Sequence, residues 1–185
     1  MANNAKGRCP GGGAGMLEII RKRRSVRAFK KDAVEEEKLR EIFLAAMFSP
    51  NARGTRPWEF IVVKEQATKE ALSMITHSAR FVKGAPVIIV VCFDTTKGRR
   101  LKEDSSICAE HIHLEAVNQG LASCFVQIAD AGEPQGSAEP TVKKLLDIPE
   151  HIFVQCMMPI GYALRELAPH KDSEYDGGKI HEERF

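Results

Sequence analysis

The sequence has little of what marks a membrane, secreted or nucleic-acid-binding protein. No apolar run approaches the roughly 18 residues that a membrane-spanning helix needs, and the first 15 residues lack the apolar segment of a signal peptide. Basic and acidic residues nearly balance, at 27 and 25, and aromatic residues make up only 6%. A surface-wide attraction to nucleic acid or anionic lipid is therefore not expected. We expect a cytoplasmic protein that contacts neither nucleic acid nor membrane.

The sequence also lacks any Cys-x-x-Cys pair, and its number of cysteines is odd. The five cysteines are Cys9, Cys92, Cys108, Cys124 and Cys156. The last four lie in apolar runs, where cysteine is typically a small core residue with a reduced thiol. Cys108 and His111 share one face of a predicted helix, and His113 lies on another, but no further thiol or carboxylate completes a set of ligands. The sequence predicts no metal site.

The length of 185 residues and the 43% hydrophobic content suit a single domain with one sizeable core. Residues 1–15 are rich in glycine and show no periodicity, so we expect a flexible N-terminal tail that includes Cys9. The remaining residues, 16–185, are predicted to form one domain.

Hydrophobic periodicity along residues 16–185 alternates between helical and strand patterns. Helices are predicted over 32–48, 68–75, 105–119 and 141–147, the first beginning with a capping box of Asp32 and Glu35. Strands are predicted over 58–64, 86–93, 122–128 and 153–163. The unbroken β-branched run at 86–93 is typical of a central strand covered on both faces. The helix at 105–119 is apolar on more than one face, which indicates burial against two surfaces, one of them a candidate partner-subunit surface. This order predicts an α+β fold around one sheet.

The densest cluster of positive charge is RKRRSVRAF, residues 21–29. Val26 and Phe29 are spaced to hold this segment on the core while its cations point elsewhere. Arginine binds phosphate bidentately through its planar guanidinium, and a serine within the cluster adds a hydroxyl donor. The donors are Arg23, Arg24, Ser25 and Arg27. They suit a phosphate monoester, while a solvated basic patch and a nucleic-acid contact remain alternatives.

RRSVRAF and a second stretch, SPNARGTRPWEF at residues 49–60, together resemble the nitroreductase family of FMN-dependent oxidoreductases. That family carries R-[RH]-S-x-[RK]-x-F and [SA]-P-[ST]-x-x-N-x-Q-P-W-x-F at a similar separation. Four more stretches, at 85–91, 115–128, 148–163 and 179–185, look like its remaining landmarks in the same order. The resemblance implies a three-layer α/β/α fold with a central mixed, mainly antiparallel sheet. It also implies an intertwined homodimer with FMN at the subunit interface.

The resemblance assigns the basic residues to two parts of FMN. Arg23 and Ser25 fall where the family holds the phosphate, and Arg24 falls where it places an arginine or histidine beside it. Lys171 matches loosely a late basic residue that also reaches the phosphate. Arg27 matches the cation that the family sets against N1 and O2 of the flavin ring. Since two-electron reduction puts negative charge on N1, a fixed cation there stabilises the reduced form.

The second stretch corresponds to a loop that the family's other subunit contributes to the flavin site. Pro50, Asn51 and Ala52 match the residues of that loop. Gly54 and Arg56 replace the asparagine and glutamine that are usual there, so two side-chain amides are missing. Arg56 adds a cation that would favour an anionic substrate, with an exposed loop arginine as the alternative interpretation.

Gln127 and Ile128 fall where a backbone N–H of the family approaches flavin N5, and Ile128 replaces the usual small glycine. The implied activity is NAD(P)H oxidation coupled to reduction of a nitroaromatic, a quinone or a similar acceptor, by ping-pong hydride transfer through N5. No side chain is assigned as a general acid. Other redox chemistry of the family, such as dehalogenation or ring dehydrogenation, is one alternative. A flavin-binding or regulatory protein without turnover is the other.

Overall fold

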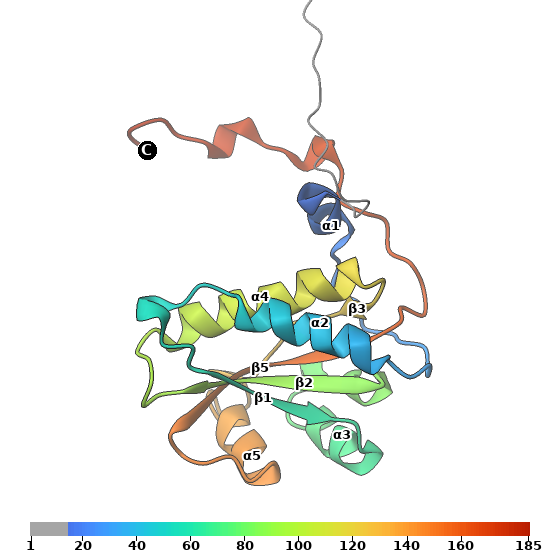
Figure 1. Ribbon diagram of the computed structural model, residues 1–185, viewed down its shortest axis with the longest axis vertical. Helices are drawn as coiled ribbons and strands as arrows, with labels where there is room; N and C mark the ends of the chain where they lie inside the picture. The colour runs from blue at the N-terminus through green and yellow to red at the C-terminus, as the bar shows by residue number, and fades with distance from the viewer. Residues whose placement is uncertain (1–14) are drawn as a thin grey trace, which may run out of the picture.

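Residues 15–185, the part of the chain that the computed structural model describes, contain five α-helices, five strands and five short 3-10 helices (Figure 1). The predicted tail, apart from Gly15, and its Cys9 lie outside the described residues. The helices are α1 (Met16–Lys22), α2 (Glu36–Met47), α3 (Gln66–Ser73), α4 (Leu101–Asn118) and α5 (Ala138–Leu145). The strands are β1 (Trp58–Val63), β2 (Val87–Asp94), β3 (Ala122–Ser123), β4 (Val126–Gln127) and β5 (Ile152–Gly161).

The strands form one sheet in the order β1-β2-β5-β3, with β4 also paired to β5. All of these strand pairs are antiparallel, and the one parallel pairing within residues 15–185 is an isolated bridge between Ser25 and Ser123. Every residue of β2 is buried, and β2 lies between β1 and β5. The predictions of a mainly antiparallel sheet and of a central strand near 86–93 are confirmed.

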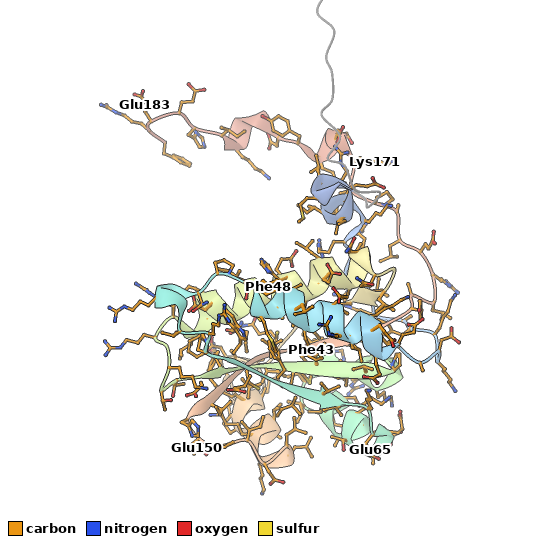
Figure 2. The ribbon with its side chains drawn as sticks, viewed as in Figure 1. Phe43, Phe48, Glu65, Glu150, Lys171 and Glu183 are labelled. Carbon is orange, nitrogen blue, oxygen red and sulfur yellow. The ribbon has the colours of Figure 1, made fainter. Side chains whose placement is uncertain are left out.

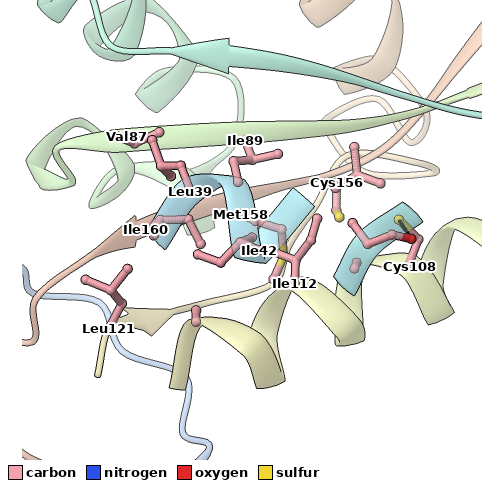
Figure 3. Close-up of a cluster of buried hydrophobic side chains, with 14 of the residues drawn as sticks. Leu39, Ile42, Val87, Ile89, Cys108, Ile112, Leu121, Cys156, Met158 and Ile160 are labelled. Atoms are coloured by element: carbon pink, nitrogen blue, oxygen red, sulfur yellow. Dashed lines mark hydrogen bonds between the residues drawn. The ribbon is translucent and has the colours of Figure 1, made fainter. Parts of the chain in front are cut away.

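Two hydrophobic cores lie on opposite faces of the sheet, because successive side chains of a strand point to opposite sides. Val87, Ile89 and Val91 of β2 pack with α2 and α4, in the core drawn in Figure 3. The intervening residues, 88, 90 and 92, pack with α3 and α5. Helices therefore cover both faces (Figure 1), as the three-layer prediction requires.

The basic segment after α1 is held by hydrogen bonds on both sides. Its backbone bonds to Ser123 of β3 at 3.0 Å and to residues 162–164, directly after β5, at 2.8 and 2.9 Å. Val26 and Phe29 are buried there in a small third core. The prediction that these two residues hold the segment on the domain is confirmed.

The structure differs most clearly from the predicted elements at two places, the start of α2 and the strand predicted over 122–128. The capping box at Asp32 is wrong: α2 begins at Glu36, and the Glu35 carboxylate instead accepts the Tyr162 hydroxyl at 2.7 and 2.8 Å. The strand predicted over 122–128 is interrupted at residues 124 and 125, which separate β3 from β4. Both short strands nevertheless pair with β5 in one continuous register.

Three helices begin earlier than predicted, because polar residues form their first turns. The Glu65 carboxylate accepts the N–H groups of Ala67 and Thr68, so α3 starts at residue 66. Acidic residues in the first turn of α4 suit the positive end of its dipole, so that helix starts at 101 and replaces part of the predicted loop. Pro140 lies in the first turn of α5, where backbone N–H groups make no hydrogen bond within the helix. Proline, which lacks this N–H, is therefore tolerated there, and the helix starts at 138.

The four cysteines among the described residues are buried and unpaired, as predicted. Burial raises the pKa of both Cys92 and Cys108 to about 12, so these thiols stay protonated at neutral pH. None of the helices within residues 15–185 is long and apolar enough to cross a lipid bilayer.

Candidate functional site

The basic segment presents its side chains in two directions, because it leaves α1 in an extended conformation from Arg23 onwards. Ser25 and Arg27 line a cavity of about 500 Å³, together with Leu164 and Leu167. Arg24 lines a different cavity, of about 570 Å³, with Lys22 and Lys30. The polar side chains of this segment that were predicted to hold FMN are therefore neighbours along the chain that do not all face one cavity.

Arg23 lies over two polar residues of α4, the half-exposed Glu110 and the buried His113. Its side chain is 26% exposed, and its Nε is 4.0 Å from Oε1 of Glu110. His113 is buried one turn further along α4, with Nδ1 3.7 Å from Glu110 and Nε2 3.3 Å from the carbonyl oxygen of Arg24. Burial, with a contribution from the Arg23 charge, lowers the pKa of His113 to about 4. The neutral imidazole thus supports the backbone of the basic segment.

Sequence reasoning missed this role of His113. The three-residue spacing from Glu110 is visible in the sequence, but the contact with Arg24 joins residues 89 positions apart. No local pattern reports such a contact.

Ser25 lies beside a buried polar group that has no partner in the chain. Its backbone bridges to Ser123, whose hydroxyl oxygen is the one buried side-chain N or O atom without a hydrogen bond among the described residues. The thiol of Cys124 is also near: burial raises its pKa, and the Arg27 charge and a hydrogen bond from Ser25 oppose that shift. An unpaired buried hydroxyl is uncommon, and here it adjoins the residues predicted to hold a phosphate.

Arg27 is exposed and carries an uncompensated charge. Its guanidinium carbon lies 6.0 Å from the centre of the Phe81 ring, and Nη1 is 3.5 Å from the carbonyl oxygen of Ser25. Within residues 15–185 it makes no ion pair. A cation held against an aromatic ring, with no carboxylate partner, suits an anionic ligand.

Arg24 and Lys171 lie where α1 meets the segment that follows β5. The guanidinium of Arg24 donates a hydrogen bond to the carbonyl of Ala168. The N–H of His170 donates to the carbonyl of Arg21 at 2.8 Å, which brings the exposed Lys171 beside α1 (Figure 2). The structure thus brings Lys171 to the end of α1 that carries the basic segment, although its side chain contacts none of the other predicted ligands.

The loop after α2 is held on the first turn of α4. The N–H of Ala52 donates to the buried carboxylate of Asp104 at 3.1 and 3.3 Å. The side-chain oxygen of Asn51 accepts the N–H of Arg56 at 3.0 Å, while Pro50 is exposed. Gly54 adopts φ 66°, a left-handed conformation that glycine tolerates without strain.

The two predicted halves of the site do not meet within one chain. Asp104 under the loop and Glu110 under Arg23 are six residues apart on α4, about 9 Å along its axis. The cavity of Ser25 and Arg27 includes no residue of 50–54, and the cavity lined by Ala52 includes no residue of 23–27.

Apolar side chains that a monomer leaves exposed cluster on the α2 and α4 side of the sheet and on the projecting ends of the chain. Phe48, at the end of α2, is 72% exposed, and it is labelled in Figure 2. Helix α1 and the segment after residue 164 stand away from the domain (Figure 1). The other exposed apolar side chains in these regions are Met16, Leu17, Ile20, Met47, Ile107, Leu164, Leu167, Tyr175, Ile180 and Phe185. This surface suits an interface with another chain.

The residues predicted near flavin N5 differ in accessibility. Ile128 is fully buried, and its N–H donates to the carbonyl of Gln155 at 3.0 Å. Gln127 is exposed, with its side-chain amide donating to the carbonyl of Ala129 at 2.9 Å. Gln155, a buried polar residue of β5 that the sequence did not single out, also lies 3.3 Å from the hydroxyl of Ser105. Gln127 is therefore the exposed residue of the pair, and Ile128 is the buried one.

The described residues contain no group of three or more potential metal-ligating side chains of histidine, cysteine, aspartate and glutamate. Nδ1 of His111 lies 3.0 Å from the carbonyl of Ala45, and the thiol of Cys108 lies 3.6 Å from the carbonyl of Ala46. Both side chains therefore contact the backbone of α2.

A family model, related sequences and solved structures all place the chain among nitroreductases and related oxidoreductases. A family model described as "Nitroreductase family" matches residues 20–80 and 76–162. A protein of Thermus thermophilus named NADH dehydrogenase is 44% identical, over 80% of this chain and 86% of its own length. The solved structure of an FMN-dependent nitroreductase from Clostridium difficile R20291 is 35% identical, covers 91% of this chain and 99% of its own, and superposes with a TM-score of 0.84. An NADPH:FMN oxidoreductase of Vibrio harveyi, solved with NAD+, shares the fold at 20% identity, with a TM-score of 0.76 over 92% of this chain and 77% of its own.

Proposed function

Since the chain belongs to the nitroreductase family and is an NAD(P)H-dependent flavin oxidoreductase, we propose that it binds FMN between two copies of itself. We propose further that its acceptors are nitroaromatics, quinones or similar small molecules. The observation that carries the proposal is the Arg23–Arg27 segment, in which Arg27 has no ion pair within residues 15–185 and Arg23 has only one distant carboxylate partner. Ser25 of this segment bridges to Ser123, whose buried hydroxyl is unpaired. When bound, FMN supplies two-electron hydride chemistry, taking electrons from NAD(P)H and giving them to the acceptor in alternate half-reactions.

The residues of the basic segment fit a flavin phosphate. Arg23 has only one distant carboxylate partner, at 4.0 Å, so its guanidinium can pair with a phosphate. Ser25 adds a hydroxyl donor, and the orphaned Ser123 hydroxyl lies next to it. Arg24 and Lys171 lie at the same end of α1 and add positive charge around this position.

Arg27 would act on the ring instead of the phosphate. Its guanidinium is exposed and held over Phe81, and it has no counter-ion within the described residues. A fixed positive charge at the pyrimidine edge of the ring would stabilise the negative charge that reduction places there. Gln127, the exposed member of the second predicted pair, would face the ring from β4.

The loop of Pro50, Asn51 and Ala52 would complete the site from the partner subunit. The bond from Ala52 to the buried Asp104 fixes the loop, so it offers a preformed wall. Gly54 brings no side chain, and this leaves open space beside the loop. The exposed apolar residues around Phe48 support burial of this region against a second copy.

The experiment that tests this proposal is a spectrum of the purified protein, before and after anaerobic addition of NADH or NADPH. We expect one FMN per chain, a dimer by light scattering, and bleaching of the flavin absorbance near 450 nm, followed by recovery when a quinone is added. A protein that remains colourless and monomeric after FMN addition would contradict the proposal. Flavin absorbance that neither nicotinamide bleaches would favour the alternative, a flavin-binding protein without turnover.

A further inference from the structure

A basic cavity of about 660 Å³ shares only Ala52 with the residues assigned to FMN. Its walls are Ala52, Arg53 and Thr55 from the loop after α2, and residues 95–100 from the turn between β2 and α4. The two walls come together because Ala52 is bonded to Asp104 in the first turn of α4, directly after that turn.

The cavity carries a local excess of positive charge. Four cations line it and no carboxylate does, although the whole chain has nearly equal numbers of basic and acidic residues. Two of the four are compensated: Lys97 pairs with Asp94 at 3.0 Å, and Arg100 lies 3.6 Å from Glu103. Neither Arg53 nor Arg99 forms an ion pair or a side-chain hydrogen bond within residues 15–185.

Hydrogen bonds and packing fix the turn that carries Arg99, so the backbone position of this arginine is defined. The hydroxyl and N–H of Thr96 bond to Asp94 at 2.6 and 2.9 Å, and these bonds, with that of Lys97, lower the pKa of Asp94 to about 2. At Gly98 a Cβ atom would lie 2.5 Å from the Phe93 ring, so the backbone packs directly on the end of the sheet.

The hydroxyl groups of the cavity already donate within the chain. Thr95 donates to the carbonyl of His151 at 2.8 Å, Thr96 donates to Asp94, and Thr55 lies 3.4 Å from the carbonyl of Ala52. The hydrogen-bond donors left for a ligand are therefore the guanidinium groups of Arg53 and Arg99, whose planar fork matches a phosphate.

We propose that Arg53 and Arg99 bind the phosphate monoester of a substrate that reacts at the flavin site. This inference rests on the proposed function, because Ala52 belongs both to the flavin-facing loop and to the cavity wall. A group bound here would be the non-reacting end of a substrate whose other end reaches the ring. Two sources carry this chemistry: the 2′-phosphate of NADPH and the 5′-phosphate of a free flavin used as acceptor.

The test uses pairs of substrates that differ only in the phosphate. With FMN-loaded protein, kcat/KM is measured for NADPH and NADH with a neutral quinone, and for free FMN and riboflavin with one donor. We expect Arg99→Gln to lower the preference for the phosphorylated member of one pair about fivefold, and the double variant with Arg53→Gln to lower it about tenfold. Lys144→Gln, an exposed single-charge loss on α5, serves as the control and leaves the ratios unchanged.

The two pairs identify the source of the phosphate. A change in the NADPH to NADH ratio assigns the cavity to the donor, and a change confined to the FMN to riboflavin ratio assigns it to the acceptor. Either result supports the site. Unchanged ratios in both pairs overturn it.

A binding measurement separates failure of this inference from failure of the proposed function. Calorimetry compares 2′,5′-ADP with 5′-AMP and FMN with riboflavin, on wild type and on the double variant. Some variants could keep bound FMN and oxidise NADH, yet distinguish the ligands of each pair as wild type does. That result refutes the phosphate site in the cavity and leaves the proposed function intact. Protein that takes up no FMN contradicts the proposed function, and a phosphate-dependent difference between wild type and the double variant then still supports an anion site.

Discussion

Replacing Arg23 with glutamine tests the proposed flavin-phosphate site most directly. A hydrogen bond to a charged group contributes about 1.5–3 kcal/mol, so loss of the guanidinium should raise the dissociation constant of FMN about 10- to 100-fold. The existing partner of Arg23 does not offset this loss, because Glu110 lies 4.0 Å away and is half exposed. In the variant, Glu110 would in addition remain as an unpaired carboxylate near the phosphate.

The assay is titration of the apoprotein with FMN, followed by quenching of flavin fluorescence. Lys22→Gln is the matched control, since it removes one positive charge at the adjacent residue. Lys22 pairs with Glu18 at 2.7 Å on the exposed surface of α1, so its loss should change FMN affinity less than about threefold. The difference between the two variants isolates the contact with the phosphate from the general loss of charge.

The stability of the apoprotein checks that the effect is local. The ion pair of Arg23 and Glu110 is long and partly exposed, so its loss should cost less than about 1 kcal/mol of unfolding free energy. Equal FMN affinity in the Arg23 and Lys22 variants, with both proteins folded, would refute the reasoning, because it would remove Arg23 from the ligand set.

Three further outcomes are expected. Ile112→Ala, in the fully buried core under α4, should lower the unfolding free energy in urea by about 2–5 kcal/mol, whereas Val62→Ala, at a side chain 41% exposed, should cost less than about 1 kcal/mol; similar losses would contradict the described core. Phe48→Glu should shift the light-scattering mass toward the monomer, and Met74→Glu, an equally exposed site on the α3 side of the sheet, should not; a dimer unaffected by Phe48→Glu would place the interface elsewhere. Because burial lowers the pKa of His113 to about 4, from 6.5, the unfolded chain binds this proton first as the pH falls. Stability linked to His113 is therefore complete above pH 6.5 and is lost toward pH 4, by on the order of 3 kcal/mol. His113→Asn should show a smaller loss between pH 7 and pH 5 in urea unfolding, and an unchanged pH dependence would mean that the histidine is not buried in its neutral form.

The order and type of most elements could be read from hydrophobic periodicity, but not α1, the division of one predicted strand into β3 and β4, or the ends of the elements. The run at 86–93 identified the central strand because burial on both faces requires apolar side chains at every position. The start of α2 could not be read in the same way, because the Glu35 carboxylate bonds to Tyr162, which lies 127 positions away. Helix ends depend on such polar contacts, and these leave little trace in a local pattern.

For the candidate site too, residue types could be interpreted from the sequence, whereas contacts between distant residues could not. The residue types of the basic segment and their resemblance to a family motif are enough to predict a phosphate-binding function. The sequence did not indicate that Arg24 turns to the carbonyl of Ala168, or that the N–H of Ile128 is already bonded to Gln155. Side-chain direction and backbone pairing are set by neighbours that are distant along the chain.

The sequence by itself therefore determined the class of the fold, the burial of the central strand on both faces and the chemical character of the basic segment, because these depend on residue type and periodicity. Only the tertiary structure decided that the basic segment and the loop at residues 50–54 lie at different positions along α4, and that Arg53 and Arg99 line one cavity. Both results depend on contacts between residues far apart in the sequence. Such contacts are set by how the helices and strands pack together, which no short stretch of residues encodes.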